Sequence, residues 1–177
     1  MSKIDRLVQR FEEVIALPWE ANLAGPQKVW FVVYDEVDER RLRARVDAFH
    51  LATQRASRDW LLCDLTDTFP SWMAAQEYRE AYFEAPEDLN LVLPDYLEYV
   101  TQLLKHTLAE ADENTLVAIL GAGTMFGFAR LSELLDGIHA AIPGRVAVFF
   151  PGEYRDNTYR LLDARSGWDY LALPITA

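Results

Sequence analysis

The chain has 177 residues, 51% of them hydrophobic, and a formal net charge of −11. Its length fits one domain with a sizeable core, and no apolar run approaches the ~20 residues that a membrane helix needs. Such an acidic chain repels nucleic acid at long range. Its charged N-terminus and single cysteine, Cys63, lead us to expect a soluble protein of the reducing cytoplasm, without a disulfide framework.

The first half of the chain alternates helix and strand signals. Residues 2–17 begin with a capping box, Ser2 to Asp5, and carry apolar residues at helical spacing. Residues 28–35 form a continuous apolar segment, which is typical of a strand buried on both faces. A second helix turns Leu42, Val46 and Phe49 inward, and residues 60–65 predict the second strand.

The second half continues the pattern. A third helix is predicted near Pro70, a fourth from Pro94, a strand at residues 116–120, and a helix after a glycine-containing loop. A strand at 145–150 should stop at Pro151 and Gly152. The tail predicts two short strands joined by a turn at 165–167. We therefore predict one three-layer α/β domain over residues 1–177, with a mainly parallel sheet flanked by helices and a C-terminal antiparallel hairpin at the sheet edge.

The loop at residues 121–127 looks like a nucleotide-binding loop that has lost its chemistry. The spacing fits neither the dinucleotide fingerprint nor the Walker sequence, and no lysine follows Lys105. A degenerate nucleotide sensor, which binds without hydrolysis, stays as one alternative function. Its candidate residues are Gly121, Gly123, Thr124, Gly127 and Arg130. We predict no cofactor, and NTPase activity is the enzymatic alternative.

Other polar residues predict no catalytic or metal site. Asp35 and Asp64 end two strands and could hold Mg²⁺, but capping of the following turns is the favoured interpretation. The histidines are not paired at metal-ligand spacing, and Cys63 is expected to be a packed, unreactive thiol. On a helix the arginines from Arg40 to Arg45 alternate with Asp38, Glu39 and Asp47, so we interpret them as a solvated helix face. Contact with nucleic acid through them is the second alternative function.

Residues 72–99 combine aromatic side chains with seven acidic residues, a mixture that suits docking on a basic partner. A structural role is equally compatible, with Trp72, Met73 and Phe83 forming the inner face of a helix. Helical spacing favours exposure of Tyr78 and Tyr82. The predicted partner-binding residues are therefore these two tyrosines, followed by the apolar loop residues Phe126 and Phe128.

Five blocks in this order resemble the BrxB family of the BREX bacteriophage-exclusion systems: KVWFVVYDE, WMAAQEYREAYFE, LVAILGAGTMFGFARLSELL, VAVFFPGEY and NTYRLLDARSGWDYLALPI. The resemblance implies a role in phage defence beside an ATPase, a DNA methyltransferase, a Lon-like protease, a small RNA-binding-like protein and PglZ. It implies no catalytic residues. We therefore expect a non-enzymatic scaffold or adaptor that binds another BREX component, with PglZ as the favoured partner.

Overall fold

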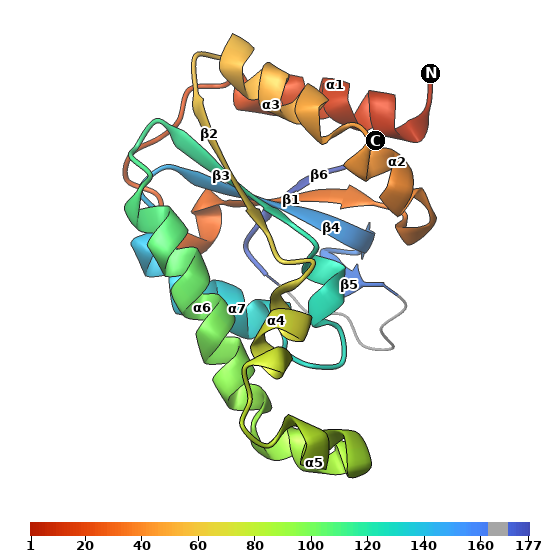
Figure 1. Ribbon diagram of the computed structural model, residues 1–177. Coiled ribbons are helices and arrows are strands. Elements are labelled where there is room, and N and C mark those ends of the chain that lie inside the picture. The colour runs from red at the N-terminus through yellow and green to blue at the C-terminus, as the bar shows by residue number, and fades with distance from the viewer. Residues whose placement is uncertain (163–169) are drawn as a thin grey trace.

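The computed structural model of the chain describes residues 1–162 and 170–177, and a mainly parallel sheet lies at its centre (Figure 1). Within the described residues the sheet has six strands in the order β2-β3-β4-β1-β6, with β5 paired to β4. All neighbours along this path are parallel. The strands are β1 (Val29–Tyr34), β2 (Asp59–Asp64), β3 (Thr115–Leu120), β4 (Arg145–Arg155), β5 (Thr158–Leu161) and β6 (Leu173–Ile175).

Helices cover both faces of the sheet, which confirms the three-layer α/β prediction (Figure 1). α1 and α3 lie on one face, and α4, α6 and α7 lie on the other. The helices are α1 (Lys3–Ile15), α2 (Glu39–Arg43), α3 (Val46–Arg55), α4 (Thr68–Ala74), α5 (Arg79–Glu84), α6 (Leu93–Ala109) and α7 (Leu131–Ile138). No helix in the described part of the chain is long and apolar enough to span a bilayer.

The residues of β1 divide between the two apolar cores by simple alternation. Phe31 and Val33 point into the core under α6 and α7, whereas Trp30 and Val32 point into the core under α1 and α3. Successive side chains of a strand face opposite sides, so a strand covered by helices on both sides must be apolar throughout. The continuous apolar segment at 28–35 is thereby explained.

α1 follows the predicted start signal. The Ser2 hydroxyl accepts a hydrogen bond from the Asp5 backbone N–H at 3.1 Å, and the Asp5 carboxylate accepts one from the Ser2 N–H at 3.0 Å. The capping box therefore satisfies two donors that the first turn would otherwise leave unpaired. Hydrogen bonding to Ser2 also lowers the pKa of Asp5.

β4 corrects one predicted boundary, because the strand continues through Pro151 and Gly152 to Arg155. Pro151 is the last residue in register with β1, opposite Tyr34. Beyond it the strand pairs with β5 instead. A Cβ on Gly152 would lie 2.0 Å from the Arg160 carbonyl oxygen, so only glycine permits this close approach. Here the Pro-Gly pair marks a change of partner and not the end of a strand.

The C-terminal hairpin is also corrected. β5 is antiparallel to β4, and β6 is parallel to β1 at the sheet edge, so the last two strands do not pair with each other. The tight turn of the observed hairpin is Asp156-Asn157, with φ values of 51° and 61°. Two consecutive residues with positive φ give a two-residue turn the twist that matches its flanking strands. The turn predicted at 165–167 lies outside the described residues.

Candidate functional site

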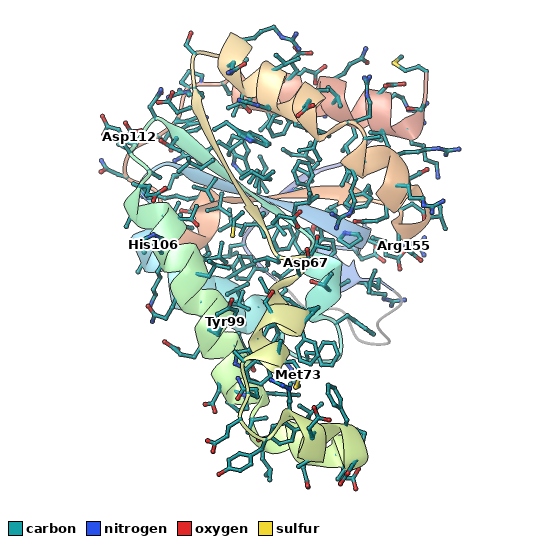
Figure 2. The ribbon with its side chains drawn as sticks, in the orientation of Figure 1. Asp67, Met73, Tyr99, His106, Asp112 and Arg155 are labelled. Atoms are coloured by element: carbon teal, nitrogen blue, oxygen red, sulfur yellow. The ribbon has the colours of Figure 1, made fainter. Side chains whose placement is uncertain are left out.

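An acidic arm, residues 75–92, extends away from the sheet and carries α5 and the 3₁₀ turn η3 (Pro86–Leu91) (Figure 1). Tyr78 is 65% exposed, Phe83 is 64% exposed and Leu91 is 80% exposed. Figure 2 shows side chains standing out from α5, with Met73 at the root of the arm. Three large apolar side chains thus lie in water on one short segment, which is a signature of an interaction surface when they are contiguous.

The charge of the arm is almost purely negative. Its acidic residues are Glu77, Glu80, Glu84, Glu87 and Asp88. The single basic residue, Arg79, donates from Nη1 to the Ala74 carbonyl oxygen at 2.8 Å and lies 3.5 Å from Glu80. The field around the exposed apolar groups is therefore uniformly acidic and attracts a basic surface.

The root of the arm is firmly packed. Trp72 and Met73 of α4 are buried, and the Tyr96 hydroxyl of α6 lies 2.9 Å from Thr68 Oγ1. Burial raises the pKa of Tyr96, so this phenol stays protonated and hydrogen-bonded over the physiological range. The packed root anchors the arm to the core.

The predicted exposure of Tyr82 is wrong, because this residue is half-buried and packs against the core on the α6 side. Phe83, which the structural alternative placed on the inner face of a helix, is exposed. Tyr78 is exposed as expected. The reason is that α4 ends at Ala74 and α5 starts only at Arg79, so helical spacing does not carry across the break. Whether Tyr78 and Tyr82 bind a partner stays a prediction.

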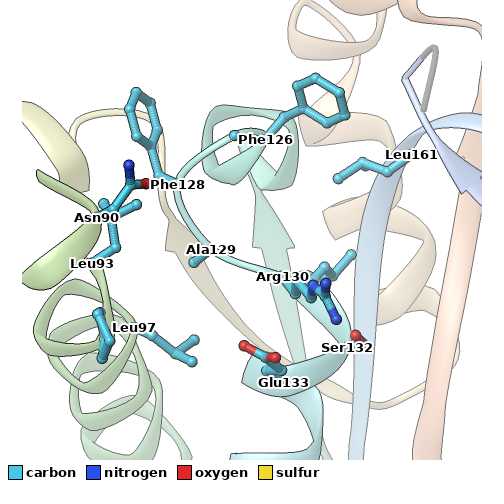
Figure 3. A pocket seen from close by; sticks show the side chains of 13 residues that line it. Asn90, Leu93, Leu97, Phe126, Phe128, Ala129, Arg130, Ser132, Glu133 and Leu161 are labelled. Atoms are coloured by element: carbon cyan, nitrogen blue, oxygen red, sulfur yellow. The ribbon is translucent and has the colours of Figure 1, made fainter. Parts of the chain in front are cut away.

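A cavity of about 660 Å³ adjoins the end of the arm (Figure 3). Leu93 and Leu97 of α6 face Leu161 of β5 across it, and the loop at 126–130 lies between them. Arg130, Ser132 and Glu133 add polar groups, and Asn90 joins the cavity to the arm. The lining residues are Asn90, Leu93, Pro94, Leu97, Phe126, Gly127, Phe128, Ala129, Arg130, Leu131, Ser132, Glu133 and Leu161.

Phe126 and Phe128 both line this cavity, but in different ways. Phe126 is 43% exposed, whereas Phe128 stacks on Phe69 with ring centroids 3.8 Å apart. Phe128 therefore belongs to a rigid wall, and Phe126 is the member that offers apolar surface to solvent. The arm and this cavity adjoin at Asn90 and together form the candidate site.

The glycine loop is built as a tight turn against its neighbours. Gly121 has φ 80°, and a Cβ there would lie 2.8 Å from the Thr66 backbone nitrogen. The Thr124 hydroxyl lies 2.7 Å from the Gly121 carbonyl oxygen and 3.2 Å from that of Leu65, both acceptors for its single proton. Gly121 and the Thr124 hydroxyl thus have structural roles where β2 and β3 end.

The candidate nucleotide residues separate into two groups. Gly121, Gly123 and Thr124 lie in the turn, where a Cβ on Gly123 would lie 3.2 Å from the Pro151 ring, whereas Gly127 and Arg130 line the cavity. The loop leads first into a 3₁₀ turn, η4 (Ala122–Met125), and α7 begins only at Leu131. A phosphate loop instead turns directly into its helix. The geometry lends the nucleotide hypothesis no support, and it stays untested.

Asp35 and Asp64 cap turns, as the favoured interpretation requires. Their carboxylates accept from the backbone N–H groups of Val37 at 3.2 Å and Thr66 at 3.0 Å. Asp35 follows β1 and Asp64 ends β2, and β3 and β4 lie between these two strands. At the usual strand spacing β1 and β2 are therefore about 14 Å apart. The two carboxylates do not share a metal. No cluster of three metal-ligating side chains occurs in residues 1–162 and 170–177.

The arginines at 40–45 are largely neutralised by neighbours. Arg41 lies 2.8 Å from Asp38, Arg43 lies 2.6 Å from Glu39, and Arg45 lies 2.9 Å from Asp5. They do not share one helix, because α2 ends at Arg43 and Arg45 caps α3. This arrangement favours the solvated-face interpretation over a nucleic-acid surface.

Sequence reasoning missed Leu91 and the Leu93–Leu97 wall of the cavity. Leu91 lies in the mainly apolar segment LNLVLP, in which no periodicity distinguishes this exposed leucine from its partly buried neighbours Leu89, Val92 and Leu93. A weak signal was present in Pro86, which breaks the helix pattern and leaves the preceding α5 too short to bury its own apolar residues.

The comparisons with known proteins give one family match. The family model described as BREX protein BrxB matches residues 65–175. The matched range covers α4 to β6 and so contains the arm, the cavity and the glycine loop. No curated protein and no solved structure matches the chain.

Proposed function

The chain belongs to the BrxB family of BREX proteins, and we propose that it acts as a non-enzymatic adaptor whose acidic arm and adjoining cavity bind another BREX component. Family membership makes it a component of a BREX phage-defence system. The adaptor role is the further step.

One observation carries the proposal: Tyr78, Phe83 and Leu91 expose large apolar surfaces on an acidic arm whose root is packed in the core. Exposed apolar groups of this size are unfavourable in water, and a partner that covers them gains about 25 cal/mol for each Å² removed from solvent. Aromatic side chains are enriched at the centres of protein interfaces, and surrounding charge sets encounter rate and salt dependence. Both features occur together here.

The chemistry of the arm selects the kind of partner. Five carboxylates border the apolar groups, so the complementary surface carries lysine or arginine around an apolar centre. The cavity between α6 and the loop at 126–130 is large enough to receive one or two apolar side chains of that partner. Among the BREX components we propose PglZ as the partner.

A co-purification experiment tests the adaptor role. The tagged chain is isolated from a host that carries the whole BREX cluster, and the proteins retained with it are identified by mass spectrometry. The test variant changes Tyr78, Phe83 and Leu91 to serine. The matched control changes Leu17, Val37 and Leu171 to serine, because these are also large exposed apolar residues but lie outside the arm.

We expect PglZ to be retained by the wild-type chain and by the control and to be lost from the arm variant. If a different BREX component is retained and is lost from the arm variant, the adaptor role is supported and that component takes the place of PglZ as the partner. Equal retention by both variants would contradict docking through the arm. Circular dichroism of both purified variants establishes that they are folded.

A further inference from the structure

Another cavity, which is polar and has a volume of about 330 Å³, lies at the opposite end of the sheet from the glycine loop. Its wall contains Arg58 just before β2, Asn114 just before β3 and Arg145 at the start of β4, so it is built at the amino ends of three neighbouring strands. Trp19, in the segment that follows α1, lies against them. None of these residues belongs to the arm or its cavity.

Arg145 is a buried cation, with only 5% of its surface exposed. Its Nη1 donates to the Gly144 carbonyl oxygen at 3.0 Å and its Nη2 to the Glu20 carbonyl oxygen at 2.9 Å. No carboxylate of the described residues lies within ion-pair distance of it. Burial and the nearby Arg58 lower the pKa of Arg145, and the charge of Glu20 raises it in part. A guanidinium nevertheless stays charged at neutral pH, so its charge is held in place without a paired anion.

Arg58 adds a second positive charge to the same place. Its guanidinium carbon lies 4.1 Å from the centre of the Trp19 ring, and that of Arg145 lies 5.2 Å from it. Arg58 Nη1 donates to Asn114 Oδ1 at 2.7 Å. The ring attracts both cations, but the two cations repel each other.

Unused donors accompany these charges. A guanidinium has five N–H groups, and the hydrogen bonds just described engage two on Arg145 and one on Arg58. The Trp19 Nε1 atom is buried and has no hydrogen-bond partner among the residues that the structure describes. A buried polar group without a partner is unusual in a native protein.

Acidic groups at this cavity stand at its outer border. Glu20 and Glu113 line it but are exposed residues, whereas the guanidinium of Arg145 is enclosed. Water screens the charges of exposed carboxylates, whereas the buried cation is screened much less. The interior is therefore positive in a chain whose net charge is −11.

We propose that this cavity binds a small oxyanion, the size of a phosphate, sulfate or carboxylate group, through Arg58, Arg145 and the indole N–H of Trp19. The anion accepts hydrogen bonds from the unused guanidinium donors and removes the repulsion between the two cations. Free phosphate and the carboxylate of another molecule share this chemistry. The site is independent of docking through the arm.

The indole N–H signals of the ¹⁵N-labelled protein give a direct test. The chain has five tryptophans, and Trp19→Phe identifies the signal of Trp19. The protein is titrated separately with sodium phosphate, sodium acetate and sodium chloride at constant ionic strength. We expect the Trp19 signal to shift and saturate with phosphate or acetate and not with chloride. If only phosphate saturates the signal, the ligand of the cavity is a tetrahedral anion. If acetate saturates it, the ligand is a carboxylate.

Arg58→Gln removes one cation while its amide can still donate to Asn114. We expect it to weaken anion binding about tenfold or more, as for loss of a charge-assisted hydrogen bond. Arg40→Gln, which lies outside the cavity, serves as the matched control and should bind as the wild type does. The proposal is overturned if the wild-type Trp19 signal only drifts without saturation, or if Arg58→Gln binds the anion with unchanged affinity.

Discussion

Phe83 offers the sharpest test of the arm, because folding leaves most of its ring in water. A phenylalanine has roughly 200 Å² of surface to bury, and at 64% exposure about 130 Å² of it remains accessible. Covering that area is worth about 3 kcal/mol at 25 cal/mol per Å². Since 1.4 kcal/mol is a factor of ten, this is about a hundredfold or slightly more in Kd. Alanine keeps the Cβ and so part of the contact, and Phe83→Ala should therefore raise the Kd for PglZ, the proposed partner, by about tenfold to a hundredfold.

The same substitution should leave the fold nearly unchanged, since exposed side chains contribute less than about 1 kcal/mol to stability. Titration calorimetry with purified PglZ measures the affinity, and urea unfolding measures the stability. Val37→Ala is the control, because Val37 is 79% exposed but lies before α2, outside the arm. An unchanged Kd for Phe83→Ala would refute the role of this ring, and a large loss of stability would show that the ring belongs to the core.

Three further predictions concern the rest of the molecule. No phosphate should be released from ATP or GTP with Mg²⁺, because the glycine loop has no lysine; release that is abolished by Thr124→Ala would contradict this. Cys63 should react slowly with a thiol reagent at pH 8 until denaturant is added, since burial, reinforced by Asp64, raises the pKa of its thiol, so thiolate forms only at higher pH than for a free cysteine; rapid native labelling would disprove it. Tyr96→Phe should lower the free energy of unfolding by about 1 kcal/mol through loss of the contact with Thr68, whereas an unchanged urea midpoint would show the contact to be neutral.

The layers of the fold could be predicted because each depends on local periodicity. The apolar segment at 28–35 and the capping box at Ser2 both have direct physical meaning in a short window of sequence. Strand partners have no such local signal. Nothing near β6 indicates that it joins β1 and not β5, because its partner β1 lies in the first part of the chain, far from β6 in sequence.

The candidate site could likewise be predicted only where a local sequence signal exists. The composition of residues 72–99 indicates an acidic, aromatic surface, but which rings face water depends on the break between α4 and α5. For that reason Tyr82 is half-buried although exposure was predicted, and Phe83 does not take the inner-face position of the structural alternative. The arginine cavity was not predicted at all, because Trp19, Arg58 and Arg145 are far apart in sequence and meet only when the amino ends of the strands are aligned.

The position of β1 in the sheet governs when the chain can fold during synthesis. β1 lies near the start of the chain, yet its two neighbours are residues 146–151 of β4 and 173–175 of β6. A ribosome that has made only the first three-quarters of the chain exposes a strand apolar on both faces with both edges unpaired, which is a template for aggregation. Long loops must close before β1 is paired, so folding should be slow and late. Loss of the few residues of β6 would leave one edge of this strand permanently open.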